Sequence, residues 1–154
     1  MNERTVAEAL AAYFEDEIEI ATTYGYPISN SDGPLPDAVC FCREKRLTRD
    51  PGEIAEIGLE QIWVRLFTCE VSIMVEVAEQ TEAAADAADA ELRGYGAAVE
   101  DSVWADQSLG DRVPYCSPAI TCDYSTPFIR REDGVTGRLG IITLLVAEPV
   151  GHPE

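Results

Sequence analysis

The sequence predicts an α+β fold: a mostly antiparallel sheet with two main helices packed on one face, and a long β-hairpin or arm. Three observations favour this class. Apolar residues recur at helical spacing in residues 6–20 and 81–105, and they alternate with polar residues in residues 62–77. Two extended runs also flank the turn dipeptide at residues 133–134. At 154 residues, we expect one domain spanning residues 1–154.

The first helix is predicted from about Val6 to Ile20, with Thr5 as an acceptable N-cap. Its apolar face comprises Val6, Ala9, Leu10, Tyr13 and Phe14. Residues 21–37 collect Gly, Pro, Ser, Asn and Asp, so a loop with extended stretches is expected there.

Residues 38–47 are predicted to form the next strand, which a turn at residues 50–52 ends. The end of this strand is basic. Its cationic cluster consists of Arg43, Lys45, Arg46 and Arg49. A solvated strand end is the favoured interpretation of this cluster, and a contact with a partner is the alternative.

Residues 62–77 alternate with a period of two, which is typical of a half-buried strand. One face carries Val71, Ile73, Val75 and Val77, and the other carries Glu70, Ser72, Met74 and Glu76. A strand over this whole range would be roughly 50 Å long, which exceeds the usual length. We therefore expect either a bulge near Thr68 or a β-arm that leaves the body.

Thr81 is expected to cap a second helix whose apolar stripe lies against the sheet. The stripe comprises Ala85, Ala88, Leu92, Tyr95, Val99 and Val103. Gly94 and Gly96 each cost about 1 kcal/mol relative to Ala in a helix interior. They indicate a close approach, a kink or a shorter helix.

Residues 119–131 and 135–148 are predicted to pair as a hairpin around Asp133 and Gly134. Residues 140–146 are apolar on both faces, which indicates an interior strand or an interface strand. Arg130, Arg131 and Arg138 lie toward the hairpin tip. A solvated, partly paired surface is the favoured interpretation of these arginines over a partner contact.

The net charge of −18 disfavours a protein that grips nucleic acid, because phosphate binding needs clustered cations. The negative charge concentrates in residues 53–108, which carry two arginines against thirteen carboxylates. No apolar run reaches the length of about 20 residues that a membrane-spanning helix needs. The first residues lack the pattern of a secretory signal, so we expect a cytoplasmic protein.

Cysteine and histidine usage argues against acyl-transfer catalysis. A glycosidase with paired carboxylates is not excluded by composition, but nothing singles out two of the 29 carboxylates. The five cysteines, an odd number, are predicted to be free thiols rather than a disulfide framework or a zinc site. They are Cys40, Cys42, Cys69, Cys116 and Cys122. The single histidine, His152, is poorly placed to serve as a catalytic base, and no phosphate-binding glycine motif is present. We therefore expect no catalytic residues, no metal and no cofactor.

The second half of the chain resembles the tail terminator family of long-tailed bacteriophages, small proteins that cap the tail tube. The resemblance rests on an alternating strand, an Ala- and acid-rich helix, a helix end of the form DxSLG, and a closing strand of the form GRxGxxxLxxxV. The corresponding segments are residues 69–78, 81–105, 106–113 (DQSLG with Arg112-Val113) and 137–146 (GRLGIITLLV). With the first helix, the resemblance covers residues 5–20 and 69–147. Residues 21–60 and the two helix glycines depart from it.

The resemblance implies a virion protein of the tail neck, made in the bacterial host cytoplasm, that forms a ring, usually of six subunits. Such a ring binds the last ring of the major tail tube protein, stops its polymerisation and presents its other face to the head-to-tail connector protein. DNA passes through its lumen without specific binding. We expect subunit contacts at the two groups of basic residues, since a ring needs complementary patches on each subunit. The strand at residues 62–77 and the hairpin at residues 119–148 are further candidates, with core strands as the alternative.

Other functions remain open at this point. A different neck component, such as a stopper or completion protein, has similar size and charge. A small-molecule-binding α+β domain with a pocket near Trp63, Tyr95, Trp104 and the cysteines is less favoured, because such aromatics usually belong to the core. An acidic decoy that mimics DNA fits the charge but has no motif in its support.

Overall fold

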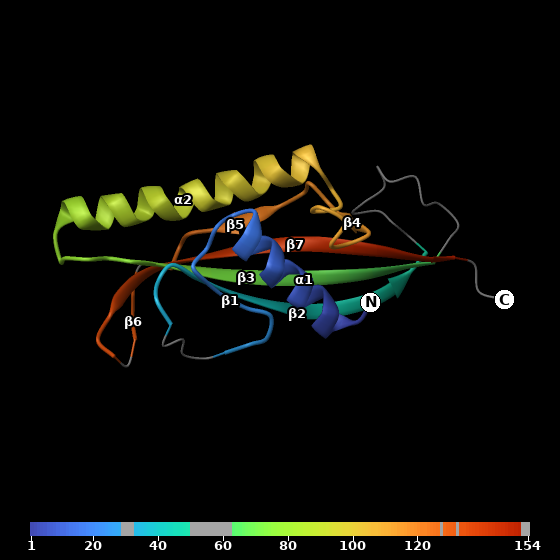
Figure 1. The fold of residues 1–154 in the computed structure, drawn as a ribbon, viewed down its shortest axis with the longest axis horizontal. Helices are drawn as coiled ribbons and strands as arrows, with labels where there is room; N and C mark the ends of the chain where they lie inside the picture. Colours follow the sequence, from blue (N-terminus) through green and yellow to red (C-terminus); the bar gives the residue numbers. More distant parts are fainter. Residues whose placement is uncertain (29–32, 50–62, 127, 132, 152–154) are drawn as a thin grey trace.

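A computed structural model describes residues 1–28, 33–49, 63–126, 128–131 and 133–151, and it confirms the α+β class (Figure 1). Two helices pack against a curled, mostly antiparallel sheet. The elements are α1 (Glu3–Asp16), β1 (Thr22–Tyr24), β2 (Asp37–Thr48), β3 (Trp63–Glu76), α2 (Glu82–Ala105), β4 (Tyr115–Cys116), β5 (Thr121–Asp123), β6 (Ile129–Arg130) and β7 (Thr136–Gly151).

The sheet has the order β1-β2-β3-β7, and the short strands β4, β5 and β6 share the other edge of β7. β1 runs parallel to β2, and every other pairing is antiparallel. The 14 residues of β3 are interior, with β2 on one side and β7 on the other. Of the two alternatives predicted for this range, a β-arm that leaves the body is therefore not formed by β3. Because both backbone edges of β3 are paired within the chain, edge pairing of this strand with another subunit is excluded as well.

The irregularity expected near Thr68 lies on the neighbouring strand. Cys42 is opposite Cys69 and Glu44 is opposite Thr68, so Arg43 is an extra residue in β2. A bulge of this kind bends the strand and increases its twist. The extra residue is therefore in β2, and β3 contributes one residue to each pairing on either side of it.

The predicted hairpin has one long strand and one interrupted strand. Residues 119–131 form β5 and β6, which are separate short strands, whereas β7 continues to Gly151. At the tip, the amide of Arg131 donates to the carbonyl of Val135 at 2.8 Å, and Gly134 has a φ of 87°. This positive φ suits glycine, as the dipeptide signal predicts.

The first helix begins and ends earlier than predicted. Asn2, not Thr5, is the N-cap, and the two residues form a capping box with reciprocal bonds of 2.9 Å. α1 ends at Asp16 because the amide of Ile20 bonds back to the carbonyl of Phe14 across Glu19, whose φ is 62°. Ile20 stays buried although it lies outside the helix.

The second helix begins after the Thr81 N-cap and runs to Ala105, as predicted. Gly96 is a site of close approach: a Cβ there would collide with the hydroxyl of Tyr124 and lie 3.2 Å from its Cζ. Tyr124 is also close to Gly140 of β7, where a Cβ would lie 2.9 Å from its Cδ1. Gly94, in contrast, has nothing within 4 Å. One of the two helix glycines therefore admits an aromatic ring between α2 and β7.

The main core lies between the two helices and one face of the sheet. Its helical members include Val6, Leu10, Tyr13, Phe14, Leu92, Val99 and Val103, and its strand members include Phe67, Val71, Ile73, Val75, Ile142, Leu144 and Val146. Val71, Ile73 and Val75 are almost fully buried, as their alternation predicts. A small second cluster of Val64, Leu66 and Ala147 forms on the opposite side of the strands.

Substituting the two helix glycines by alanine should have opposite effects on stability. Gly94→Ala is expected to raise the free energy of unfolding by up to about 1 kcal/mol, because its methyl meets nothing. Gly96→Ala should lower it, because the collision with Tyr124 outweighs the gain in helix propensity. Urea unfolding followed by circular dichroism measures both. In a Tyr124→Phe background the cost of Gly96→Ala should shrink, and equal effects at both glycines would contradict the packing described.

Tyr13 should make the protein sensitive to alkaline pH. Burial raises the pKa of Tyr13 to about 12 in the folded protein, against about 10 in an unfolded chain. The neutral side chain of Tyr13 therefore contributes its full stabilisation below pH 10, and this stabilisation is lost as the pH rises toward 12. Tyr13→Phe is expected to remove about 1 kcal/mol of the loss between pH 8 and pH 11, measured by urea unfolding. Tyr26→Phe, at an exposed ring, should keep the wild-type pH dependence, and an unchanged dependence in Tyr13→Phe would refute the assignment.

Candidate functional site

The basic cluster predicted on the second strand lies along the exposed end of β2. The bulge and the pleat distribute its members over both faces of the strand. Arg43 pairs with Glu70 at 2.8 Å, Lys45 pairs with Glu3 of α1 at 3.4 Å, and the Arg49 guanidinium lies 5.7 Å from the centre of the Trp63 ring. Arg46 is also exposed and has a polar partner. These pairs are exposed, so each contributes at most about 1 kcal/mol.

This end of β2 is an edge strand. β1 pairs only with Asp37–Val39, and within the described residues no strand lies along the outer side of the rest of β2. Charged side chains and a bulge are features that keep an edge strand from pairing with other chains. Leu47 interrupts the charges, and its side chain is 56% exposed. The edge therefore offers side chains for contact rather than its backbone.

The hairpin-tip arginines have different environments. Arg138 is only 12% exposed, and its guanidinium donates to the carbonyl of Tyr124 at 2.6 Å, to Asp89 of α2 at 3.1 Å and to the carbonyl of Thr126. It joins β7 to α2 and to the segment between β5 and β6. Hydrogen bonds from Arg93 and then Arg138 lower the pKa of the Asp89 carboxyl. Arg138 is thus a structural residue at this end of the sheet.

Arg131 is also used inside the fold. Its side chain is 8% exposed, donates to the carbonyl of Gly33 at 2.8 Å and pairs with Asp133 at 2.5 Å. The bond from Arg131 lowers the pKa of Asp133. Arg130, in contrast, is exposed. Of the three arginines that the sequence groups together, Arg130 is the one presented to solvent.

Sequence reasoning missed a hollow beside the start of α2, which we call the Phe128 hollow. It has a volume of about 420 Å³ and is lined by Val77, Glu79, Gln80, Thr81, Glu82, Ala85, Phe128 and Thr136. The Phe128 side chain is 50% exposed there. No local signal marks it, because Phe128 stands beside Ile129 in a run expected to be a strand, and only the fold brings this residue to the beginning of α2.

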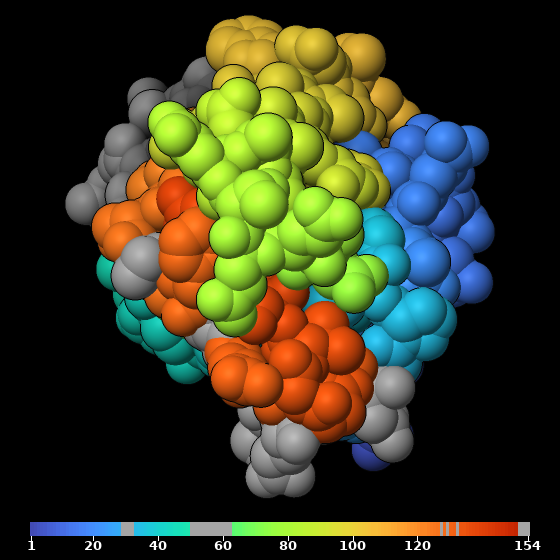
Figure 2. All heavy atoms as spheres, turned by 90° about the vertical axis from the view of Figure 1, so that its left-hand side faces the viewer, coloured from blue at the N-terminus to red at the C-terminus, as the bar shows by residue number. Residues whose placement is uncertain are grey.

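The basic end of β2 and the Phe128 hollow lie at opposite ends of the sheet. In Figure 1 the start of α2 and the hairpin of β6 and β7 occupy one end, and the end of β2 with the start of β3 occupies the other. Figure 2 looks onto the first end, where the start of α2 lies beside the hairpin. Carboxylates of α2, including Glu82, Asp86 and Asp89, surround this end. These carboxylates of α2 and the basic cluster of β2 are therefore separated by the length of the sheet.

The DxSLG-like segment forms a turn that its own side chains stabilise. The Asp106 carboxylate accepts from the Ser108 hydroxyl at 2.7 Å and from the amide of Gly110 at 2.8 Å, and these bonds lower its pKa. Leu109 is buried although its φ is 53°. This turn is thus a fixed structural element at the end of α2.

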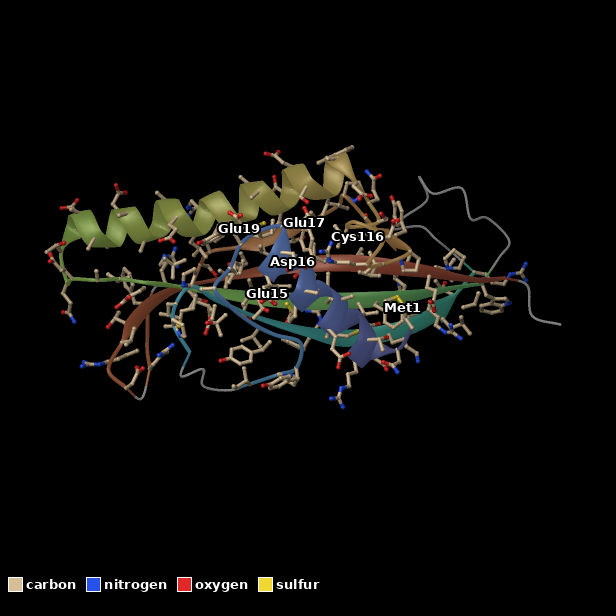
Figure 3. All side chains as sticks on the ribbon, viewed as in Figure 1. Met1, Glu15, Asp16, Glu17, Glu19 and Cys116 are labelled. Carbon is tan, nitrogen blue, oxygen red and sulfur yellow. The ribbon has the colours of Figure 1, made fainter. Side chains whose placement is uncertain are left out.

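Arg112 connects this turn to the first helix. Its guanidinium pairs with Asp16 at 2.9 Å and Glu17 at 3.4 Å and donates to the carbonyl of Leu109 at 2.8 Å. Figure 3 shows Asp16 and Glu17 together with Glu15 and Glu19 at the end of α1. Asp16 and Glu17 therefore have a structural role, because they join the end of α1 to the turn that follows α2.

The cysteines are free thiols in the structure. Burial raises the pKa of both Cys40 and Cys116 to about 12, and it also raises that of Cys69. These thiols are therefore protonated at neutral pH and poorly nucleophilic. No group of three or more His, Cys, Asp or Glu side chains in the described part of the chain is placed to hold a metal ion.

The aromatic residues considered for a small-molecule pocket do not gather around one cavity. Trp104 is 67% exposed at the end of α2, Trp63 stacks with Arg49, and Tyr95 donates to Glu91 at 3.2 Å.

Among the helices that the structure describes, none is long and apolar enough to span a membrane. Neither a protein-family model nor a curated protein matches this chain.

Replacing Arg138 should destabilise the fold, whereas replacing Arg130 should not. Arg138→Met is expected to lower the free energy of unfolding by about 2 kcal/mol or more, because it leaves the carbonyls of Tyr124 and Thr126 without a charged donor and Asp89 with Arg93 alone. Arg130→Met should change it by less than about 0.5 kcal/mol. Urea unfolding tests both. Arg138→Lys should recover only part of the lost stability, since an ammonium cannot reach all three acceptors. Equal stability of the two Met variants would contradict the structural role of Arg138.

Proposed function

We propose that the protein is a structural component of a phage virion that forms a ring at the end of the tail tube. In this role it ends tube polymerisation and joins the tail to the head connector. The partners are other copies of the chain, the major tail tube protein and the connector protein. It is made in the host cytoplasm, functions in the neck region and performs no catalysis.

The observation that carries this proposal is that the segments of the family resemblance form one contiguous part of the fold. β3 and β7 pair from Glu76 and Gly137 onward along their whole length, and α2 packs on them through Leu92 and Val99. The DxSLG-like turn closes α2 and is held by Arg112. The short motifs thus correspond to a packed unit rather than to unrelated surface segments.

The charge distribution supports the same proposal. A ring of identical subunits in head-to-tail contact needs different, complementary surfaces on the two sides of each subunit. The basic end of β2 and the acidic surroundings of α2 lie at opposite ends of the sheet. A strongly anionic ring also repels DNA phosphates, which suits a passage through which DNA moves without binding.

The test is to polymerise the tail tube protein of the phage that encodes this chain, with and without the purified protein. The expected result is shorter tubes, each with extra density at one end in electron micrographs, at an amount of protein far below that of tube subunits. An unrelated protein of similar net charge is the control for a nonspecific charge effect. Tubes of unchanged length would refute the tube-capping function, and binding to the connector alone would then identify a stopper or completion protein instead.

A further inference from the structure

We propose that copies of this chain associate head to tail, with Leu47 of one copy inserted into the Phe128 hollow of the next. Lys45 of the first copy then pairs with carboxylates at the rim of the hollow. This contact would be the subunit interface of the proposed ring, so the inference rests on the proposed function. It is nevertheless a property of the purified protein alone and can be tested without the tube.

The lining and the volume of the Phe128 hollow suit the binding of an apolar side chain. Val77, Ala85 and Phe128 supply apolar surface, and the volume of about 420 Å³ is in the range of pockets that bind ligands. Phe128 is half exposed, so covering its ring removes apolar area from water. Arg138, bonded to Asp89 and to the carbonyl of Tyr124, joins β7 to α2 beside the hollow.

The rim of the hollow favours a cation. Glu79 and Glu82 belong to its wall, and Asp86 lies in the adjoining hollow with Phe128. Neither Glu82 nor Asp86 forms an ion pair with any residue that the structure describes, whereas Asp89 is already paired with Arg93 and Arg138. In a chain of charge −18, an acidic partner would be repelled here.

The basic end of β2 has the matching features. Leu47 is a large apolar side chain, 56% exposed, in a strand segment that is otherwise charged. Lys45 lies two residues before it and on the same side of the strand. Its bond to Glu3 is 3.4 Å long and solvent-exposed, so exchanging it for a rim carboxylate costs little.

A second copy of the chain is the occupant that these features specify. Leu47 and the hollow lie at opposite ends of the sheet, so one molecule cannot fill its own hollow (Figure 1). Contact between two different surfaces of identical subunits is heterologous and builds a closed ring when the rotation closes. Both an apolar insertion and a pairing of opposite charges support it, which fixes the orientation of the two copies.

The first experiment measures association by sedimentation velocity over a range of concentrations. The wild type is expected to exceed the monomer mass of 16.8 kDa, and Leu47→Asp should raise the concentration needed for half association at least about tenfold. Tyr26→Asp is the matched control, because Tyr26 is also 56% exposed and lines a separate hollow that contains neither Leu47 nor Phe128. Urea unfolding of each variant verifies that the fold is retained. A wild type that stays monomeric, or a Leu47→Asp variant that associates normally, would overturn the proposal.

The second experiment tests the orientation of the contact. Lys45→Glu and Glu82→Lys should each weaken association, and a mixture of the two variants should form pairs through the restored contact. In a background lacking the partly buried thiols of Cys42 and Cys122, Leu47→Cys and Phe128→Cys copies should form a disulfide with each other under mild oxidation by glutathione disulfide. Neither should link efficiently to itself, and self-linked Leu47→Cys as the main product would refute head-to-tail contact.

The two proposals fail in different ways. If Leu47→Asp abolishes association but the wild type does not shorten tubes, the contact stands and the tube-capping function is rejected. If Leu47→Asp and Glu82→Lys proteins still assemble and cap tubes like the wild type, the function stands and this contact is rejected.

Discussion

The antiparallel pairing of β3 with β7 is the constraint on which the other elements depend. All 14 residues of β3 are paired with β7, and β2 occupies the opposite edge of β3. β7 in turn provides the edge for three short strands and, with β3, the apolar face on which α2 packs. Because every core residue of these strands is fixed by this register, a slip by one residue would turn Val71, Ile73 and Val75 away from the helices.

The sequence was most informative where one physical signal dominated over a long range. The alternation around Val71 and the stripe through Leu92 and Val99 locate β3 and α2 closely, because burial of one face requires these periods. The end of α1 was less predictable, since Ile18 and Ile20 continue the apolar pattern into the core after the helix has stopped. β1 has only three residues and is defined by its partner, so no local pattern identifies it.

The candidate interface shows a similar limit. The sequence located the basic residues but not their environments: Arg138 and Arg131 belong to the fold because Asp89, Tyr124 and Gly33 come to them from distant segments. The Phe128 hollow depends on the same long-range contacts and has no local signature. Charge and hydrophobic patterns therefore locate candidate surfaces, whereas tertiary contacts decide which charged groups are already used internally.

The bulge at Arg43 determines which face of the sheet each later residue of β2 joins. Before it, even-numbered residues such as Cys40 and Cys42 face the helices, and after it Lys45 and Leu47 take that side, because Lys45 is opposite the core residue Phe67. The extra residue Arg43 thus shifts by one residue the alternation of side chains between the two faces of β2. Deletion of Arg43 would remove the bulge and leave Lys45 and Leu47 on their present side, whereas one further, regularly paired residue would exchange the two sides of the rest of β2. Insertions here should therefore be far less tolerated during evolution than substitutions of Arg43 itself.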